Sequence, residues 1–257
     1  MFNTTLLFCC FVFLSSTFIF AQEQAAIPSS LKIKHTPDFS ISGKGTEAAW
    51  NKAEWNELQP RNFSEQKNTG RNLPAEVVLQ AGPHYTTRFK ILYSENGIYC
   101  LYECEDSIIT ATIITDFGDL YKEDVVEIFL WPDTSISSYF EYELSPLNFE
   151  LPLLIINRHG KAMGWKPWKY EGSRQIIHAV NIDSNKINAQ GRFTWSAEFF
   201  IPFKLLTPLV AEKPSAGTKW RANFYRIDYD GNPQYSSWKE TRKNFHDFER
   251  FGFIEFE

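Results

Sequence analysis

The sequence lacks the short motifs that most directly indicate an enzyme. It has no Gly-x-Ser-x-Gly motif, which would present a nucleophilic serine, and no His-Glu-x-x-His motif, which would bind zinc. Its five histidines, His35, His84, His159, His178 and His246, are scattered along the chain. A hydrolase needs a nucleophile beside a base, or two opposed carboxylates. The absences favour a non-catalytic protein, while the plentiful acidic residues keep a glycoside-processing hydrolase as the alternative.

Cysteine is also scarce. Two of the four cysteines, Cys9 and Cys10, lie in the apolar N-terminal segment, which leaves Cys100 and Cys104. Four residues apart on one strand, their Cα atoms would be roughly 13 Å apart, at ~3.3 Å per residue. A disulfide requires less than about 7 Å. We therefore expect two small buried hydrophobic side chains rather than a disulfide or a metal-binding pair.

No charged side chain occurs in the first 21 residues, which run through an apolar stretch to Ala21. This pattern is typical of a secretory signal peptide, residues 1–21, cleaved after Ala21. The apolar run of about 15 residues is short of the ~20 that span a bilayer. An uncleaved anchor is the alternative, because no Lys or Arg stands near Met1. We expect a protein that is secreted, periplasmic or on the cell surface, with no membrane span after cleavage.

The net charge of −5 comes without a dominant basic stripe. Binding to nucleic acid would require such a stripe. The charge therefore argues against a nucleic-acid partner, but it identifies no other partner.

The remaining pattern is that of strands and turns. We interpret residues 22–37 as a linker and residues 38–257 as a single domain with ten to twelve strands. The clearest local prediction is a hairpin of residues 88–94 and 98–103, joined by Asn96-Gly97 as a positive-φ turn. Helix is limited to a short segment after Thr46 and one turn at 202–206. The fold class is all-β: an antiparallel, two-sheet β-sandwich of jelly-roll or immunoglobulin-like type.

Two strands carry acidic residues whose orientation matters. Residues 125–131 are apolar on both faces except for Glu127, so this carboxylate either faces solvent or lies in a pocket, where it would need partners. In residues 139–145 the alternation predicts that Phe140, Tyr142 and Leu144 face the core. Tyr139, Glu141 and Glu143 would then face outward. We expect residues 161–168 to form a loop.

Several aromatic residues have no clear place in a core: Tyr121, Trp165, Trp168, Trp238 and Phe245. A flat ring can cover the C–H faces of a sugar, while carboxylates, amides and Arg bind its hydroxyls. A few placed polar groups beside aromatics is the usual design of a small-ligand site. Packing in the core is the alternative for each ring.

Several segments carry, in order, a resemblance to family 9 carbohydrate-binding modules. They include Trp50 after Gly43-Lys-Gly45, Asp124-Val-Val-Glu-Ile-Phe-Leu130, Trp195-Ser-Ala-Glu-Phe-Phe-Ile-Pro202, Trp220-Arg-Ala-Asn-Phe-Tyr-Arg-Ile-Asp228 and the closing Phe251-Gly252. The resemblance covers about residues 38–257. It is greater to the family-9-like proteins of Bacteroidetes than to the modules attached to xylanases.

The resemblance implies a β-sandwich that holds a sugar, a mono- or oligosaccharide end, between two aromatic rings. The matching positions are Tyr121 and Phe245, where tryptophan is usual, and Glu127 would accept hydrogen bonds from sugar hydroxyls. We expect Trp238 and Arg242 to line the wall of the same site. The family often carries structural calcium, whose ligands cannot be assigned here. The implied role is polysaccharide utilisation, and an interaction domain that has lost sugar binding is a further alternative.

Overall fold

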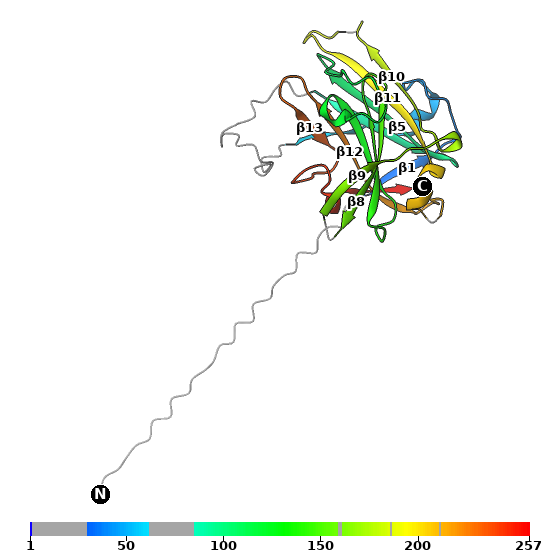
Figure 1. Ribbon diagram of the computed structural model, residues 1–257, viewed down its shortest axis with the longest axis vertical. Helices are drawn as coiled ribbons and strands as arrows, with labels where there is room; N and C mark the ends of the chain where they lie inside the picture. Colours follow the sequence, from blue (N-terminus) through cyan, green and yellow to red (C-terminus); the bar gives the residue numbers. More distant parts are fainter. Residues whose placement is uncertain (2–29, 62–84, 159–160, 186, 211) are drawn as a thin grey trace.

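The computed structural model describes residues 1, 30–61, 85–158, 161–185, 187–210 and 212–257 (Figure 1). Within these residues the only α-helix is the single turn α1 (Phe203–Leu206), as predicted near Pro202. Short 3-10 turns occur at η1 (Ala48–Lys52), η2 (Leu120–Lys122), η3 (Gly172–Arg174), η4 (Thr207–Leu209) and η5 (Phe248–Arg250). Thr46 is not a helix cap, because Glu47 precedes η1 and makes no side-chain cap. Apart from Met1, the predicted signal peptide lies outside the described residues.

One layer of the fold is a sheet built around β6 and β12. Its strands follow the order β14-β12-β6-β7-β8-β9, and β13 and β3 extend it beside β12. The strands are β3 (Gln59–Arg61), β6 (Val125–Trp131), β7 (Ser138–Leu144), β8 (Glu150–Arg158), β9 (Lys161–Pro167), β12 (Lys219–Asp228), β13 (Gln234–Ser237) and β14 (Gly252–Phe256). All pairs within this layer are antiparallel. The expected loop at 161–168 is thus wrong, since most of it is strand β9.

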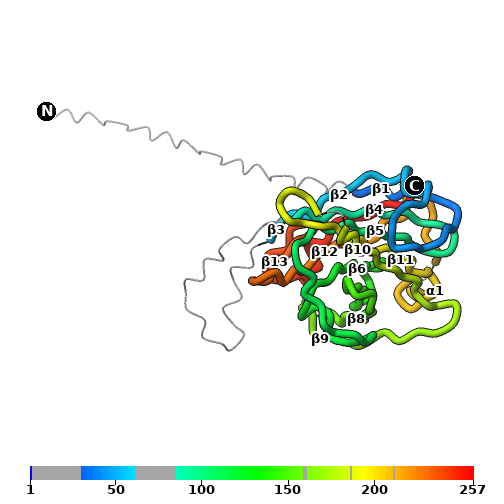
Figure 2. The backbone as a smooth tube through the Cα atoms, turned by 90° about the horizontal axis from the view of Figure 1, so that it is seen from above, coloured from blue at the N-terminus to red at the C-terminus, as the bar shows by residue number. Residues whose placement is uncertain are grey.

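The second layer is smaller and follows the order β10-β11-β5-β4, with β2 paired to β4. Its strands are β2 (Asn56–Glu57), β4 (Thr87–Tyr93), β5 (Gly97–Asp106), β10 (Ile177–Asp183) and β11 (Phe193–Pro202). The layers pack through a core in which Phe89 of β4 stacks on Phe224 of β12 at 3.8 Å between ring centroids. The predicted β-sandwich is therefore confirmed, and its two layers can be followed in Figure 2.

One strand joins the two layers and departs from the antiparallel prediction. β1 (Leu31–His35) pairs in parallel with β14 through residues 31–33 and in parallel with β4 through residues 34–35. It lies inside the segment 22–37 that we interpreted as a linker. Only Ile33 of β1 is buried, which is why the sequence gives such a weak strand signal here. The fold is thus a mixed sheet at this edge, and residues 31–35 are part of it.

The predicted hairpin is confirmed, but its turn differs from the prediction. β4 and β5 pair antiparallel, with Tyr93 opposite Ile98. Neither Asn96 nor Gly97 has a positive φ, so the turn is not a positive-φ Asn-Gly turn. Gly97 is needed for another reason: a Cβ at this position would lie 2.3 Å from the carbonyl oxygen of Ile201. The glycine lets β11 approach the start of β5.

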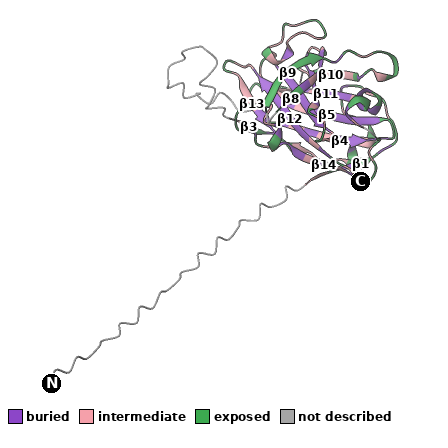
Figure 3. Cartoon of the chain, turned by 60° about the horizontal axis from the view of Figure 1, so that its bottom comes forward, coloured by how far each residue is buried: buried purple, intermediate pink, exposed green. Residues whose placement is uncertain are grey.

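The sheet around β6 is covered on both faces, which positions the functional site. Its inner face packs on the second layer, while its outer face forms a separate cluster with residues of the 113–121 and 245–251 segments. Every residue of β6 is buried, whereas β9 is exposed along its whole length (Figure 3). Cys100 and Cys104 are buried free thiols, as expected.

The segments that cover the outer face of the β6 sheet correct the prediction for β7. Phe140, Tyr142 and Leu144 do face the inner core. Tyr139, Glu141 and Glu143 point to the opposite face, but they do not reach solvent, because each is at most 4% exposed. A two-residue alternation reports which side chains share a face, and it cannot report that a distant loop covers that face.

Candidate functional site

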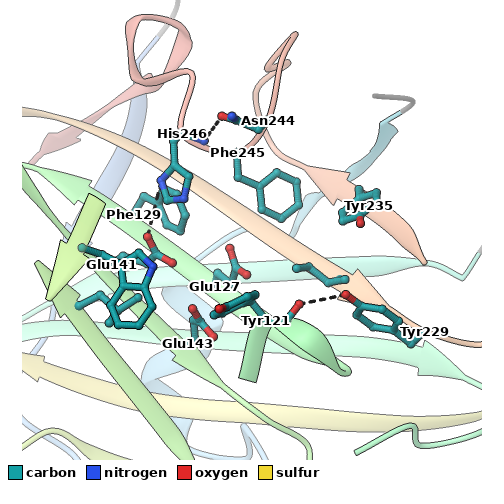
Figure 4. A pocket seen from close by; sticks show the side chains of 13 residues that line it. Tyr121, Glu127, Phe129, Glu141, Glu143, Tyr229, Tyr235, Asn244, Phe245 and His246 are labelled. Carbon is teal, nitrogen blue, oxygen red and sulfur yellow. Dashed lines mark hydrogen bonds and ion pairs between the residues drawn. The ribbon is translucent and has the colours of Figure 1, made fainter. Parts of the chain in front are cut away.

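A cavity of about 260 Å³ lies on the outer face of the β6 sheet (Figure 4). Strand residues form its floor, and the segments around Tyr121 and Phe245 rise beside it. Its lining residues are Tyr121, Glu127, Phe129, Glu141, Glu143, Leu153, Trp165, Ile227, Tyr229, Tyr235, Asn244, Phe245 and His246. The structure therefore brings together three residues that the sequence analysis placed at one site: Tyr121, Glu127 and Phe245.

Tyr121 is held at the cavity by the short turn η2. The turn is closed by a hydrogen bond from the Glu123 N–H to the Leu120 carbonyl. The Tyr229 hydroxyl donates to the Tyr121 carbonyl at 3.1 Å, which ties η2 to the end of β12. Lys122 is engaged by Asp119 on the solvent side. The ring of Tyr121 is thereby placed beside the cavity by backbone contacts, so its side chain is not needed to hold the turn.

Phe245 comes from the other side of the cavity, more than a hundred residues away in sequence. Its ring stacks on Tyr225 at 4.1 Å, and the Tyr225 hydroxyl donates to the Phe245 carbonyl at 2.8 Å. Tyr235 meets the same ring edge-on at 5.7 Å. Figure 4 shows Phe245 and Tyr121 on opposite sides of Glu127. Both rings line the same cavity, which a sugar held by two aromatic side chains would require.

Three glutamates share the floor. Glu127 of β6 is in register with Glu143 of β7, and Glu141 stands two residues earlier on the same face. They are 2%, 0% and 4% exposed, respectively. Directly opposite residues of an antiparallel pair have Cβ atoms about 5 Å apart. The cavity therefore holds a compact group of carboxyls at its base.

Burial governs the ionisation of this group. It raises the pKa of Glu141 to about 8. Burial also raises the pKa of Glu127, and the charge of Glu141 raises it further. For Glu143, burial comes first, followed by the charges of Glu127 and Glu141. The three carboxyls thus hold protons at pH values where exposed glutamates are ionised, because like charges and a low-dielectric site both oppose ionisation.

His246 completes the wall next to Phe245. Its ring stacks on Phe129 at 5.3 Å, and its Nδ1 is hydrogen-bonded to the Tyr139 hydroxyl at 2.8 Å. Glu141 Oε2 lies 3.8 Å from the same nitrogen. Burial lowers the pKa of His246 to about 4, so the ring is neutral near pH 7. The lining therefore has no positive charge at neutral pH among the residues that the structure describes.

Sequence reasoning missed several lining residues. Trp165 was noted only as an aromatic without a core role, and it is 42% exposed on β9 at the cavity. Glu141 and Glu143 could have been found from the pairing of β7 with β6, had that register been known. Tyr229, Tyr235 and His246 carry no periodic signal, because they lie at or beyond the ends of strands.

Trp238 and Arg242 are not brought to this cavity. Trp238 follows β13, and its N–H donates to the Phe224 carbonyl at 2.9 Å. This register turns its ring toward the inner core, edge-on to Phe224 at 5.6 Å and to Phe89 at 6.2 Å. Arg242 is exposed, and its backbone N–H donates to Asp247. The expectation that both line the wall is thus not met.

Three acidic residues outside the cavity lining, Asp106, Asp124 and Asp228, are buried. Asp106 and Asp228 pair with the buried guanidinium of Arg226. Asp124 accepts hydrogen bonds from the backbone N–H groups of Thr110 and Tyr229 at 2.6 and 2.7 Å. These contacts anchor the segments on either side of Tyr121.

No group of three or more His, Cys, Asp or Glu side chains placed to hold a metal occurs within the described part of the chain. The expected calcium therefore has no assigned ligands, and it stays a prediction. The same residues contain no helix of sufficient length and apolar character to cross a membrane.

Comparison with known proteins resolves the family. The sequence profile of carbohydrate-binding family 9 matches residues 74–256, most of the chain. The chain belongs to carbohydrate-binding family 9. Among curated proteins, none matches the sequence significantly.

Solved structures agree with this family 9 fold. A candidate carbohydrate-binding protein from Bacteroides uniformis superposes with a TM-score of 0.65 at 16% identity, covering 90% of this chain and 100% of that protein. A family 9 module from Caldicellulosiruptor kristjanssonii in complex with cellotriose gives a TM-score of 0.56 at 16% identity, covering 89% and 94%. The same module in complex with glucose gives 0.56 and 16%, covering 89% and 96%. At this identity the likeness establishes the fold.

Proposed function

We propose that this family 9 chain is an exported, non-catalytic protein that binds the end of a carbohydrate chain in polysaccharide utilisation. The sugar would lie between Tyr121 and Phe245, with Glu127 accepting hydrogen bonds from its hydroxyls. The observation that carries the proposal is the cavity that both rings line, at the positions that the family resemblance indicates. Its volume is slightly below the ~300–1,000 Å³ of typical ligand pockets. That size favours one sugar unit at a chain end over a long internal stretch.

The lining supports a sugar better than a purely apolar ligand. Aromatic side chains, chiefly Tyr121, Trp165 and Phe245, supply apolar surface for the C–H faces of a ring. Glu127 and Asn244 supply polar atoms for hydroxyls. An interaction domain that had lost sugar binding would be expected to fill the space between Tyr121 and Phe245, and that space is a cavity.

The hydrolase alternative needs a second carboxyl near Glu127, and Glu141 and Glu143 stand beside it. Their arrangement nevertheless disfavours catalysis. A glycosidase places its two carboxyls on either side of the scissile bond. Here all three carboxyls rise from adjacent strands on one floor. Among the described lining residues, the facing wall carries Asn244, Phe245 and His246 in place of a second acid.

A glycan-array screen followed by titration of the sugars that bind tests the proposal. The mature protein is screened against a glycan array, and each sugar that binds is titrated while tryptophan and tyrosine fluorescence is recorded. We expect saturable binding with a change in emission, because Trp165 lines the cavity. Tyr121→Ala is expected to weaken binding by about tenfold or more, since loss of one stacked ring costs on the order of 1–3 kcal/mol.

Tyr93→Phe is a suitable control, because Tyr93 lies at the far edge beside Phe256 and its change leaves the cavity intact. Release of reducing ends from the bound glycan over the same period would show catalysis instead. Absence of binding across the array, with Tyr121→Ala indistinguishable from wild type, would reject the sugar site.

A further inference from the structure

The carboxyls of the cavity floor have few partners besides one another: Glu141 and Glu143 interact with each other, and Glu141 Oε2 lies 3.8 Å from His246 Nδ1. No N–H or O–H group of the described residues donates at hydrogen-bond geometry to either oxygen of Glu143 or to Oε2 of Glu141, and these atoms are buried. Buried polar atoms are nearly always hydrogen-bonded, and an orphaned one indicates a missing partner. Glu143 is completely buried and lines the cavity. A ligand that supplies donors at this floor would therefore satisfy several acceptors together.

Acidic side chains predominate over basic ones in the lining of the cavity. Its described lining residues include three glutamates and no Lys or Arg, and the one basic side chain is His246. Lys122 Nζ lies 5.7 Å from the centroid of the Tyr121 ring, and it is paired with Asp119. Hydroxyl groups can donate to carboxylates, but they bring no countercharge. Burial keeps these carboxyls protonated near pH 7 because an unpaired buried charge is costly, and a cation bound beside them would stabilise their ionised form.

The rings around the floor are also suited to a cation. Tyr121, Trp165, Tyr229 and Tyr235 line the cavity together with Phe245. An ammonium group near an aromatic face is attracted by the ring quadrupole, more strongly when water is excluded. Carboxyls below and aromatic rings at the sides form an environment for a ring-shaped ligand that carries a positive charge.

We infer that this cavity selects an amino sugar, a pyranose bearing a protonated primary amine that donates to Glu141 and Glu143. The inference rests on the proposed sugar-binding function and assigns its ligand class. The amine supplies up to three donors, which matches the three orphaned oxygens. The sugar ring occupies the space between Tyr121 and Phe245, and Glu127 accepts from a hydroxyl.

Binding of a cation changes the protonation of the floor. Burial raises the pKa of Glu127, Glu141 and Glu143, so near pH 7 the group holds protons. The other titratable groups that line the cavity are uncharged at this pH: Tyr121 of η2, Tyr229 after β12, Tyr235 of β13, and His246. An ammonium ion favours ionised carboxylates, so amino-sugar binding releases protons. A neutral sugar has no such effect.

Calorimetric titration of the mature protein tests the inference with matched pairs. The ligands are glucosamine, galactosamine and mannosamine, each against the neutral parent sugar and the N-acetyl derivative. We expect at least one amine to bind about tenfold more tightly than both neutral counterparts, because a hydrogen bond to a charged group contributes more than a neutral one. Titration at pH 7 in buffers of different ionisation enthalpy should reveal proton release with the amine only.

Two variants test which side chain produces the preference for the amine. Glu143→Gln keeps the side-chain shape and removes the ionisable carboxyl, and we expect it to abolish the preference for the amine over its neutral counterparts. Glu47→Gln, at an exposed position outside the cavity, serves as the control and should retain the preference. If Glu143→Gln does not fold, the buffer comparison on the wild-type protein still decides.

The possible outcomes distinguish failure of the amino-sugar inference from failure of the proposed sugar-binding function. Neutral sugars that bind as tightly as their amines would overturn the inference and leave the sugar site standing. Ethanolamine that binds as tightly as the amino sugars would overturn it too, because the pyranose ring would then contribute nothing. Failure of every sugar, charged or neutral, would reject the proposed function together with the inference.

Discussion

Removal of one buried carboxyl should make the fold more stable at neutral and mildly alkaline pH. Glu141 is 4% exposed, and its Oε2 has no partner among the described residues. Burial raises its pKa from 4.5 to about 8. Because the folded state holds this proton more tightly than the unfolded chain does, stability is lost as pH rises from about 4.5 toward 8. Glu141→Gln keeps the shape and removes the titration.

The magnitude is worked for pH 6.5 to 8, where Asp124 and Glu150, whose pKa values burial raises to about 7, add the same loss of stability to wild type and variant. The pKa of His246 is lowered below 6.5, so its contribution to stability is lost only as pH falls below 6.5. Between pH 6.5 and 8, Glu141 alone should cost the wild-type protein roughly 1.5 to 2 kcal/mol, at 1.36 kcal/mol per pKa unit. For a domain of this size that corresponds to a Tm decrease of roughly 3 to 8 °C. The raised pKa values of Glu127 and Glu143 act in the same direction.

Thermal unfolding at pH 6.5 and pH 8 measures the effect in wild type, Glu141→Gln and the exposed control Glu47→Gln. We expect the Tm difference between the two pH values to be smaller in Glu141→Gln by several degrees, and unchanged in Glu47→Gln. A wild-type Tm that is constant or rises over this range would refute the reasoning. So would a Glu141→Gln variant with the same pH dependence as wild type.

Four further substitutions test the packing described above. Trp238→Ala should destabilise the fold by about 3 kcal/mol in urea unfolding, because its ring packs on Phe89 and Phe224. Arg242→Ala should change neither stability nor sugar affinity. Equal effects of the two substitutions would contradict the core position of Trp238 and the exposed position of Arg242. Gly97→Ala should cost roughly 1–3 kcal/mol, since its Cβ would meet Ile201, and wild-type stability would contradict the close approach. Arg226→Leu should cost about 3–5 kcal/mol by leaving Asp106 and Asp228 without their partner, and a neutral result would show that neither is charged.

Local patterns predicted most strands because those strands have strong signals. The 88–103 hairpin and the run at 125–131 combine apolar or aromatic residues with clear boundaries, and both occur as expected. β9 could not be found this way, because all of its residues are exposed and backbone pairing to β8 alone holds it in place. β1 was missed because a single buried residue, Ile33, stands in a polar context.

The site was partly predictable and only through the family resemblance. Composition and periodicity do not connect Tyr121 with Phe245, which depend on the packing of η2 and of the loop before η5. The alternation predicted the face of Glu141 and Glu143 correctly, but it missed their burial, because the segments that cover this outer face are far away in sequence. Trp238 was expected to line the wall of the site, but the register of β13 with β12 turns its ring toward the inner core.

The central claim is that a sugar ring lies between Tyr121 and Phe245 above the glutamate floor. A crystal structure of the mature protein with the tightest-binding sugar from the array tests it most directly. The account predicts the terminal ring in the cavity, with Tyr121 and Phe245 on its two sides and a hydroxyl within hydrogen-bond distance of Glu127. A sugar bound instead beside Trp55 on the outer face of the β5 sheet, with the Tyr121 cavity empty, would contradict it.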